Sequence, residues 1–210
     1  MKKIISFSLY GTDLKYSNGM ICNVELASII YPDWICRIYY DNLVPENIIK
    51  NLKNYQNVEL VNMSDNNKFQ MMWRFLAIDD DDVEIMIVRD ADSRLSYREK
   101  KCVDLFIESE KILHSIRDNV SHFDIMGGMW GIKKNNRINI NKLMENWDKI
   151  GYDADQQFLR TKLVPIFNDS LLIHCSKYLN TFPIEPTNEY FVGGWWPEDN
   201  FGKPINYIFF

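Results

Sequence analysis

The sequence lacks the features that would place it outside the class of ordinary folded domains. It has only 9 glycines and 7 prolines among 210 residues, and 46% of its residues are apolar, which excludes collagen-like, disordered and low-complexity chains. No apolar run approaches the roughly 18 residues that a membrane span needs. Ser6 and Ser8 interrupt the apolar residues near the N-terminus, so no signal-like core forms there. We therefore expect one compact domain, folded throughout and without a membrane span.

The chain also lacks a basic tract and any close pair of cysteines. Its 24 Lys and Arg residues are scattered against 29 Asp and Glu residues, and the formal net charge is −5, so no nucleic-acid footprint is visible. The cysteines show no CxxC spacing, which argues against a zinc knuckle and against a disulfide framework. A reducing, cytoplasmic location fits this pattern best. The four cysteines are Cys22, Cys36, Cys102 and Cys175.

Strand and helix patterns alternate along the first half of the chain and become less regular later. This order predicts a single α/β domain with a Rossmann-like, mainly parallel twisted sheet and helices on both faces, which binds ligands at the carboxyl ends of its strands. From apolar and β-branched runs, strands are expected at 3–10, 34–40, 58–63, 83–88, 112–116, 124–132 and 170–175. From helical spacing and capping signals, helices are expected at 18–30, after Pro45, and at 69–78, 96–110, 141–149 and 155–162, with a proline-rich surface loop from residue 181.

The most informative segment is the apolar strand at 83–88, which delivers two carboxylates just where the chain leaves the sheet. Asp90 and Asp92 are the hard oxygen ligands that Mg²⁺ or Mn²⁺ takes in phosphate sites, where water and substrate phosphate fill the other positions. The alternative is a solvated Asp-x-Asp turn. The buried strand before the acids and the flanking Arg89 and Arg94 favour a metal site that binds a nucleoside diphosphate.

Five segments and one histidine give the chain a resemblance to a known family. They are SFSLYG at 6–11, MWRF at 72–75, VRDADSR at 88–94, IMGGMWGI at 125–132 and DQQFL at 155–159, followed by His174. With these segments the chain resembles the GT-A-fold glycosyltransferases, in particular the small transferase domains encoded by large algal DNA viruses.

The resemblance implies an enzyme that transfers a hexose or deoxyhexose from a nucleoside-diphosphate sugar, a UDP-sugar, to an acceptor hydroxyl of a glycan. It implies Mn²⁺ or Mg²⁺ as the cofactor. It also implies a nucleotide-sugar-binding half at about 1–95 and an acceptor-binding half at about 96–210, and the host cytoplasm as the location of a viral protein.

In such enzymes the loop after the first strand holds the base and the ribose, which points to Leu9, Tyr10 and Gly11. Tyr10 could stack on uracil, or it could be a plain strand-end aromatic residue. Arg74 could bind phosphate with its planar fork, or it could orient the acids of the Asp90-Ala91-Asp92 motif instead.

The later segments carry the acceptor side of the predicted site. His174 could be a further metal ligand, although a lone histidine is more often structural. Gly128 and Trp130 could approach a sugar, or they could belong to a bulged strand with a core tryptophan. Asp155, or less favourably its neighbour Asp153, could remove the proton from the acceptor hydroxyl, and the alternative is that Asp155 caps a helix. His122, just before this glycine-rich segment, is expected to be structural, but it could approach a sugar.

Two other functions compete with sugar transfer. A nucleotidyltransferase that makes sugar nucleotides would also use a metal and a similar sheet, but it would want a glycine-rich basic loop after the first strand, where this chain has 10–15, YGTDLK. A non-catalytic sugar- or nucleotide-binding module is the second competitor. Release of the diphosphate from a donor in the presence of metal separates an enzyme from a binding module.

Overall fold

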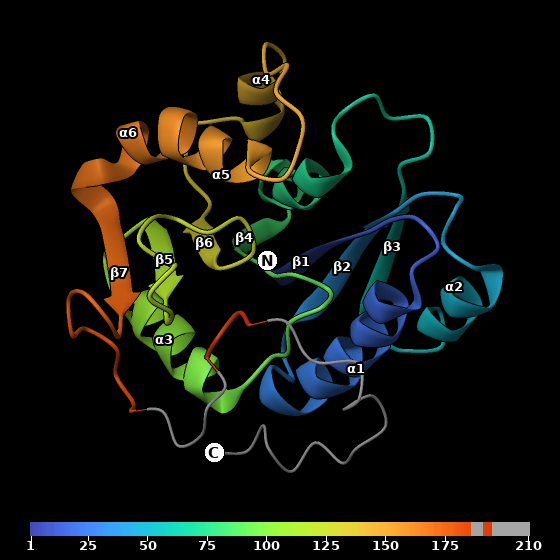
Figure 1. Ribbon diagram of the computed structural model, residues 1–210, viewed down its shortest axis with the longest axis horizontal. Coiled ribbons are helices and arrows are strands. Elements are labelled where there is room, and N and C mark those ends of the chain that lie inside the picture. The colour runs from blue at the N-terminus through green and yellow to red at the C-terminus, as the bar shows by residue number, and fades with distance from the viewer. Residues whose placement is uncertain (186–190, 195–210) are drawn as a thin grey trace.

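The computed structural model describes residues 1–185 and 191–194, and within these residues seven strands form one open sheet (Figure 1). The strand order is β3-β2-β1-β4-β6-β5-β7. The strands are β1 Lys2–Leu9, β2 Ile35–Tyr40, β3 Val58–Asn62, β4 Val83–Val88, β5 Leu113–Arg117, β6 Trp130–Lys133 and β7 Leu171–Cys175.

Most of the sheet is parallel. β1 pairs in parallel with β2 and with β4, β2 with β3, and β5 with β7. β6 runs antiparallel to both of its neighbours, β4 and β5. The expected α/β fold with a mainly parallel sheet is therefore confirmed.

The expected strand at 124–132 is wrong over most of its length. Only Trp130 to Ile132 of that range belong to β6. The residues before them form a turn, in which the amide of Met129 donates to the carbonyl of Met126. Two glycines of this turn, Gly127 and Gly128, lie against the side chains of Asp155 and Asp90.

Helices cover the sheet on both sides, and their caps follow from the sequence. Asp13 accepts a hydrogen bond from the amide of Lys15 at the start of α1, and Ser96 accepts one from the amide of Glu99 at the start of α3. The longer helices are α1 Leu14–Ile30, α2 Glu46–Leu52, α3 Tyr97–Glu108 and the 3₁₀ helix η1 Gln70–Asp79. The shorter ones are α4 Ile140–Met144, α5 Ala154–Phe158, the π-helix η2 Leu159–Leu163, α6 Val164–Phe167 and the 3₁₀ turn η3 Asn168–Ser170.

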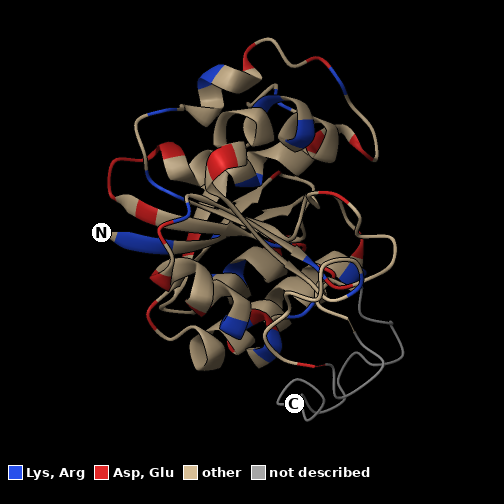
Figure 2. Ribbon diagram, turned by 90° about the vertical axis from the view of Figure 1, so that its left-hand side faces the viewer, with Lys and Arg blue, Asp and Glu red and all other residues tan. Residues whose placement is uncertain are grey.

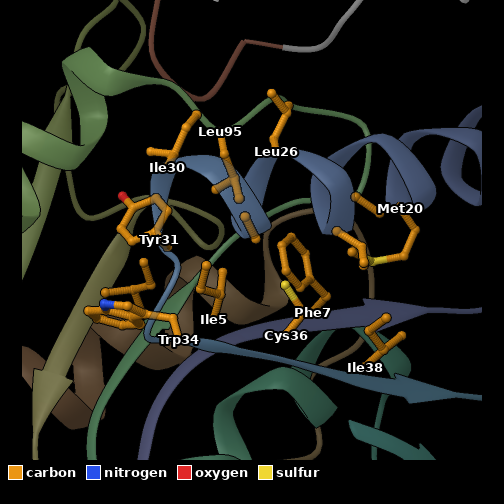
Figure 3. Packing of buried hydrophobic residues seen from close by; sticks show 14 of the residues in the cluster. Ile5, Phe7, Met20, Leu26, Ile30, Tyr31, Trp34, Cys36, Ile38 and Leu95 are labelled. Carbon is orange, nitrogen blue, oxygen red and sulfur yellow. The ribbon is translucent and has the colours of Figure 1, made fainter. Parts of the chain in front are cut away.

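Two hydrophobic cores lie on opposite faces of the sheet, which Figure 2 shows edge-on between two layers of helices. Alternate residues of a strand enter different cores, because successive side chains of a strand point to opposite faces. Ile5 and Phe7 of β1 pack with helices α1 to α3, as Figure 3 shows for α1 residues such as Met20 and Leu26. Ile4 packs instead with η1 and with helices α4 to α6.

In the part of the chain that the structure describes, none of the helices combines the length and the apolar character needed to cross a membrane. The loop expected from residue 181 agrees with residues 181–185 and 191–194, which belong to no helix or strand. Pro186, Trp195, Trp196, Pro197 and Pro204 lie outside the described residues.

Candidate active site

The carboxyl ends of β1 and β4 border a cavity of about 820 Å³. This volume lies in the range of small-molecule pockets, about 300–1,000 Å³. Because β1 and β4 are adjacent and parallel, Tyr10 and Asp90, which follow them, meet at one edge of the sheet. Gly128 and Asp155, from the later half of the chain, line the same cavity. The cavity thus occupies the edge at which an open α/β sheet binds its ligands.

Helix α1 positions the loop that carries Asp90 and Asp92. The side-chain amide of Asn23, which is 1% exposed, donates to the carbonyl of Ser93 at 2.9 Å and accepts from the amide of Leu95 at 3.1 Å. A Cβ on Gly19 would lie 2.2 Å from the carbonyl oxygen of Ala91, so only glycine lets the helix come this close. The loop is therefore held through its backbone, which leaves its carboxylates to the cavity.

A buried ion pair lies directly behind Asp90. The Nε of Arg89 is 2.7 Å from Oε1 of Glu99, and both side chains are 1% exposed. The hydroxyl of Tyr31 donates to the same carboxylate at 3.0 Å, and burial raises the pKa of Tyr31 well above its ordinary value. Arg89 also donates to the carbonyl of Trp130 at 3.1 Å. These bonds tie the end of β4 to α3 and to β6.

Arg74, on η1, lies between two acidic residues of the cavity. Its guanidinium donates through Nη1 to Asp90 and through Nη2 to Asp155, the second at 2.9 Å. Nη1 also donates to the carbonyl of Arg89 at 3.1 Å. Burial lowers the pKa of Arg74, but the charges of Asp90 and Asp155 raise it by more, so the guanidinium stays charged. The planar fork therefore joins Asp90 to an acid from the other half of the chain.

Asp155 faces the cavity and does not cap its helix, since Asp153 occupies the N-cap position of α5. Its Oδ1 accepts from the amide of Gln156 at 2.8 Å. Burial and the charge of Asp90 raise the pKa of Asp155, while Arg74 lowers it, and the net shift is upward. A raised pKa makes the carboxylate a stronger proton acceptor.

Two adjacent glycines make room for the two acids. A Cβ on Gly127 would lie 1.9 Å from Oδ2 of Asp155, and a Cβ on Gly128 would lie 1.9 Å from Oδ2 of Asp90. This close approach accounts for glycine at both positions of the turn before β6. Gly128 lines the cavity, where the sequence offered it as a residue that could approach a sugar. In the structure, glycine is required at this position by the close contact with Asp90.

The residues predicted for the base and ribose differ in their surroundings. Tyr10 lines the cavity, is 37% exposed, and meets the ring of Trp73 edge-on at 6.3 Å between centroids. Ala91 also lines the cavity. Leu9 is instead buried in the core between the sheet and helices α1 to α3. Gly11 has a φ of +75°, which favours glycine, and its amide donates to Oδ1 of Asp41 at 3.2 Å.

Besides Leu9 and Gly11, two further predicted site residues, Trp130 and His174, do not line this cavity. Trp130 is wholly buried, with its ring 5.0 Å from that of Phe75, so it cannot offer a face to a sugar, and the alternative of a core tryptophan is correct. His174 lies on β7, three places from β4 in the sheet, with its Nδ1 2.8 Å from Nε2 of His114. It does not line the cavity, so we leave it out of the proposed metal site.

The cavity is also lined by Lys15 and Tyr152, which the sequence did not indicate as site residues, and by His122, which was expected to be structural. Lys15 forms an ion pair with Asp92, with Nζ 2.8 Å from Oδ2. His122 is buried, its ring meets that of Phe191 edge-on at 5.2 Å, and burial lowers its pKa, so it is neutral at pH 7. Tyr152 is 87% exposed at the rim. Lys15 follows the first strand and His122 precedes the glycine-rich segment, and these positions are the signals that the sequence offered.

The acids of the cavity fit a divalent ion that is shared with a phosphate. Oδ1 of Asp90 faces Arg74 and Oδ2 of Asp92 faces Lys15, so an ion would have to share these carboxylates with the two cations or displace them. Within residues 1–185 and 191–194, no cluster of three or more Asp, Glu, His or Cys residues forms a ready-made metal cage. Mg²⁺ in phosphate sites needs only one or two carboxylates, with water and phosphate at its other positions.

No family model and no curated protein matches the chain. Solved structures do share its fold. TarS 1–349 from S. aureus has a TM-score of 0.56 at 12% identity over 82% of this chain, which spans only 58% of that one. Its complex with UDP has a TM-score of 0.50 at 13% identity, over 82% of this chain and 57% of that one.

Two further structures resemble the chain over most of their length. The 4-diphosphocytidyl-2C-methyl-D-erythritol synthase from Anaerococcus prevotii has a TM-score of 0.56 at 12% identity, over 90% of this chain and 91% of that one. A glycosyltransferase involved in glycosylation of the major capsid of PBCV-1 has a TM-score of 0.47 at 16% identity, over 83% and 82%. At identities this low, the structures with TM-scores of 0.56 show only a shared fold, an open α/β sheet of the GT-A or Rossmann-like type.

Proposed function

We propose that the chain is a metal-dependent glycosyltransferase that transfers a sugar from a UDP-sugar to an acceptor hydroxyl of a glycan. The observation that carries this proposal is one cavity, at the carboxyl ends of β1 and β4, that unites the Asp90 and Asp92 carboxylates with Arg74 and Asp155. Two acids at such an edge suit a cation that binds a diphosphate. A separate acid with a raised pKa suits proton removal from an acceptor.

Asp90 and Asp92 would hold the Mn²⁺ or Mg²⁺ ion, which when bound neutralises charge on the leaving diphosphate. Arg74 fixes the direction of Asp90 and adds positive charge to the same region. Two unit charges ~4 Å apart interact by roughly 4 kcal/mol at an effective dielectric of 20, so a fixed cation here matters for the rate. Tyr10, at the rim of the cavity, would stack on the base.

Asp155 would take the proton of the acceptor hydroxyl as the sugar is transferred. Its carboxylate has an oxygen on Arg74 and an oxygen on the amide of Gln156, and it lines the cavity close to Asp90. This arrangement fixes the direction of the base. Proton removal by a protein carboxylate corresponds to an inverting transfer, in which the acceptor attacks the donor sugar directly.

The fold is compatible with this proposal but does not distinguish it from nucleotidyl transfer, because the synthase from A. prevotii shares the fold over nearly its whole length. Nucleotidyl transfer is therefore the second candidate. It would use a triphosphate donor, and the loop at 10–15 offers one glycine and one lysine to cradle it. TarS has been crystallised with UDP, which favours a nucleoside diphosphate. Release of UDP from a UDP-sugar, and not of pyrophosphate from UTP, distinguishes the two reactions.

We expect UDP to bind at least about tenfold more tightly in saturating Mn²⁺ than in excess chelator, because the ion links the carboxylates to the diphosphate. Isothermal titration calorimetry measures both affinities. Asp90→Asn and Asp92→Asn should remove the difference. Equal affinity of the wild-type protein under the two conditions would contradict the assignment of Asp90 and Asp92.

Replacing Arg74 by Lys keeps the charge but loses the fork that joins Asp90 to Asp155. A hydrogen bond to a charged group contributes about 1.5–3 kcal/mol, so we expect transfer to fall by about 10–100-fold. Initial rates with a UDP-sugar measure this effect, and circular dichroism checks that the fold is intact. Unchanged turnover would limit Arg74 to a packing role.

A further inference from the structure

Lys15 occupies one of the two carboxylates that the proposed ion would use. It lies in the first turn of α1, and its ammonium is 2.8 Å from Oδ2 of Asp92, with the two side chains 20% and 19% exposed. Both residues line the cavity. Burial lowers the pKa of Lys15, but its hydrogen bond with Asp92 and the charge of Asp92 raise it by more, so the ammonium stays charged.

The two cations of the cavity differ in their freedom to move. Arg74 is 5% exposed on its side chain and is held by Asp90, by Asp155 and by the carbonyl of Arg89. Lys15 pairs with Asp92 and lies 5.1 Å from the centroid of the Tyr16 ring, but its compact ammonium is carried on a flexible four-carbon stem, so the charge can move without a change in the backbone. Lys15 is therefore the cation that can change partners.

The charges of the cavity favour such an exchange. Among the described residues that line the cavity, three carboxylates, Asp90, Asp92 and Asp155, face two cations, Arg74 and Lys15, so this set of residues carries a small negative charge. A divalent ion at Asp92 would lie beside the ammonium and be repelled by it. A diphosphate adds negative charge at the same place, which gives the ammonium a new partner when the ion takes Asp92.

We propose that Lys15 is an exchangeable cation of the donor site, which neutralises Asp92 in the ligand-free protein and moves to the donor diphosphate when a divalent ion takes Asp92. This inference rests on the proposed function and adds to it that the ion and the nucleotide depend on each other for tight binding. The ion alone binds weakly, because it must displace Lys15 without giving it a partner. The nucleotide strengthens binding of the ion, and by linkage the ion strengthens binding of the nucleotide equally.

The test removes the charge of Lys15 and keeps the length of its side chain. Lys15→Met is titrated with Mn²⁺, and the free ion is followed by electron paramagnetic resonance, first without nucleotide and then with UDP. Without nucleotide, the variant should bind Mn²⁺ about tenfold more tightly than the wild-type protein, within the range usual for coupled sites. The factor by which UDP strengthens Mn²⁺ binding should shrink, and Lys15→Arg should behave like the wild type.

Lys50→Met is the matched control, because it removes the same charge from an exposed pair with Glu46 on α2, where the two side chains are 69% and 81% exposed. It should leave both Mn²⁺ affinities unchanged. Equal Mn²⁺ affinity of Lys15→Met and the wild-type protein without nucleotide, with UDP binding intact, would overturn this inference and leave the proposed function standing. Failure of the wild-type protein to bind UDP under any condition would overturn the proposed function, whereas tighter Mn²⁺ binding by Lys15→Met would still support the role of Lys15 at Asp92.

Discussion

Asp155→Asn is expected to lower sugar transfer by about 10²–10⁴-fold, the usual contribution of a general base, while UDP affinity in saturating metal survives. The amide keeps the size of the carboxylate and can still accept from the amide of Gln156, but it cannot take a proton. Arg74 keeps Asp90 as its counterion, so the donor side of the cavity should persist. Transfer rates and UDP calorimetry on the same preparation separate the two effects.

The neighbouring Asp153→Asn serves as a control, because Asp153 is exposed at the N-cap position of α5 and outside the cavity lining. It should transfer sugar at close to the wild-type rate. If Asp155→Asn does so as well, the base lies elsewhere, or the enzyme retains the anomeric configuration and needs no such base. The anomeric configuration of the product, determined by NMR, decides between these two explanations.

Glu99→Gln is expected to lower the free energy of unfolding by about 3–5 kcal/mol, because it leaves the charge of Arg89 buried without a counterion. Both side chains of this pair are only 1% exposed, so water cannot replace the lost carboxylate. Urea denaturation measures the change. The double variant Arg89→Met with Glu99→Leu should recover part of the loss, since it removes both charges together.

Glu46→Gln provides the comparison with an exposed ion pair. Its partner is Lys50, the side chains are 81% and 69% exposed, and such pairs contribute about 0–1 kcal/mol. A loss for Glu99→Gln no larger than that for Glu46→Gln would mean that the Arg89 pair is open to water in solution. The end of β4 would then be less firmly held behind Asp90 than the distances indicate.

The fold was predictable where local pattern and burial agree. The run at 83–88 is apolar throughout and became β4, Val83–Val88, without a shift at either end. The helix expected at 69–78 is a 3₁₀ helix, Gln70–Asp79. Its type could not be predicted, because apolar spacing over ten residues does not distinguish three residues per turn from 3.6. The range 155–162 became α5 and a π-helix, a change of hydrogen bonding that side-chain type does not encode.

The candidate site was predictable where a motif stands at a strand end and less so where distant residues meet. Asp90, Asp92 and Tyr10 follow strands and do line the cavity. The ion pair between Arg74 and Asp155 could not be predicted, since the two residues are 81 positions apart in the chain. His174 also follows an apolar run, but sheet order decides what lies near it, and antiparallel β6 and then β5 separate its strand from β4.

The bridge through Arg74 also has a consequence for the order of events during synthesis. Its bond to Asp90 spans 16 residues of chain, whereas its bond to Asp155 spans 81. Closing the longer loop costs more entropy and must wait until α5 has left the ribosome and docked against η1. A nascent chain that ends shortly after β4 holds both donor acids but lacks half of the counterions of Arg74. The bridge across the cavity should therefore close only once the segment through Phe158 has emerged, well after both donor acids have been made.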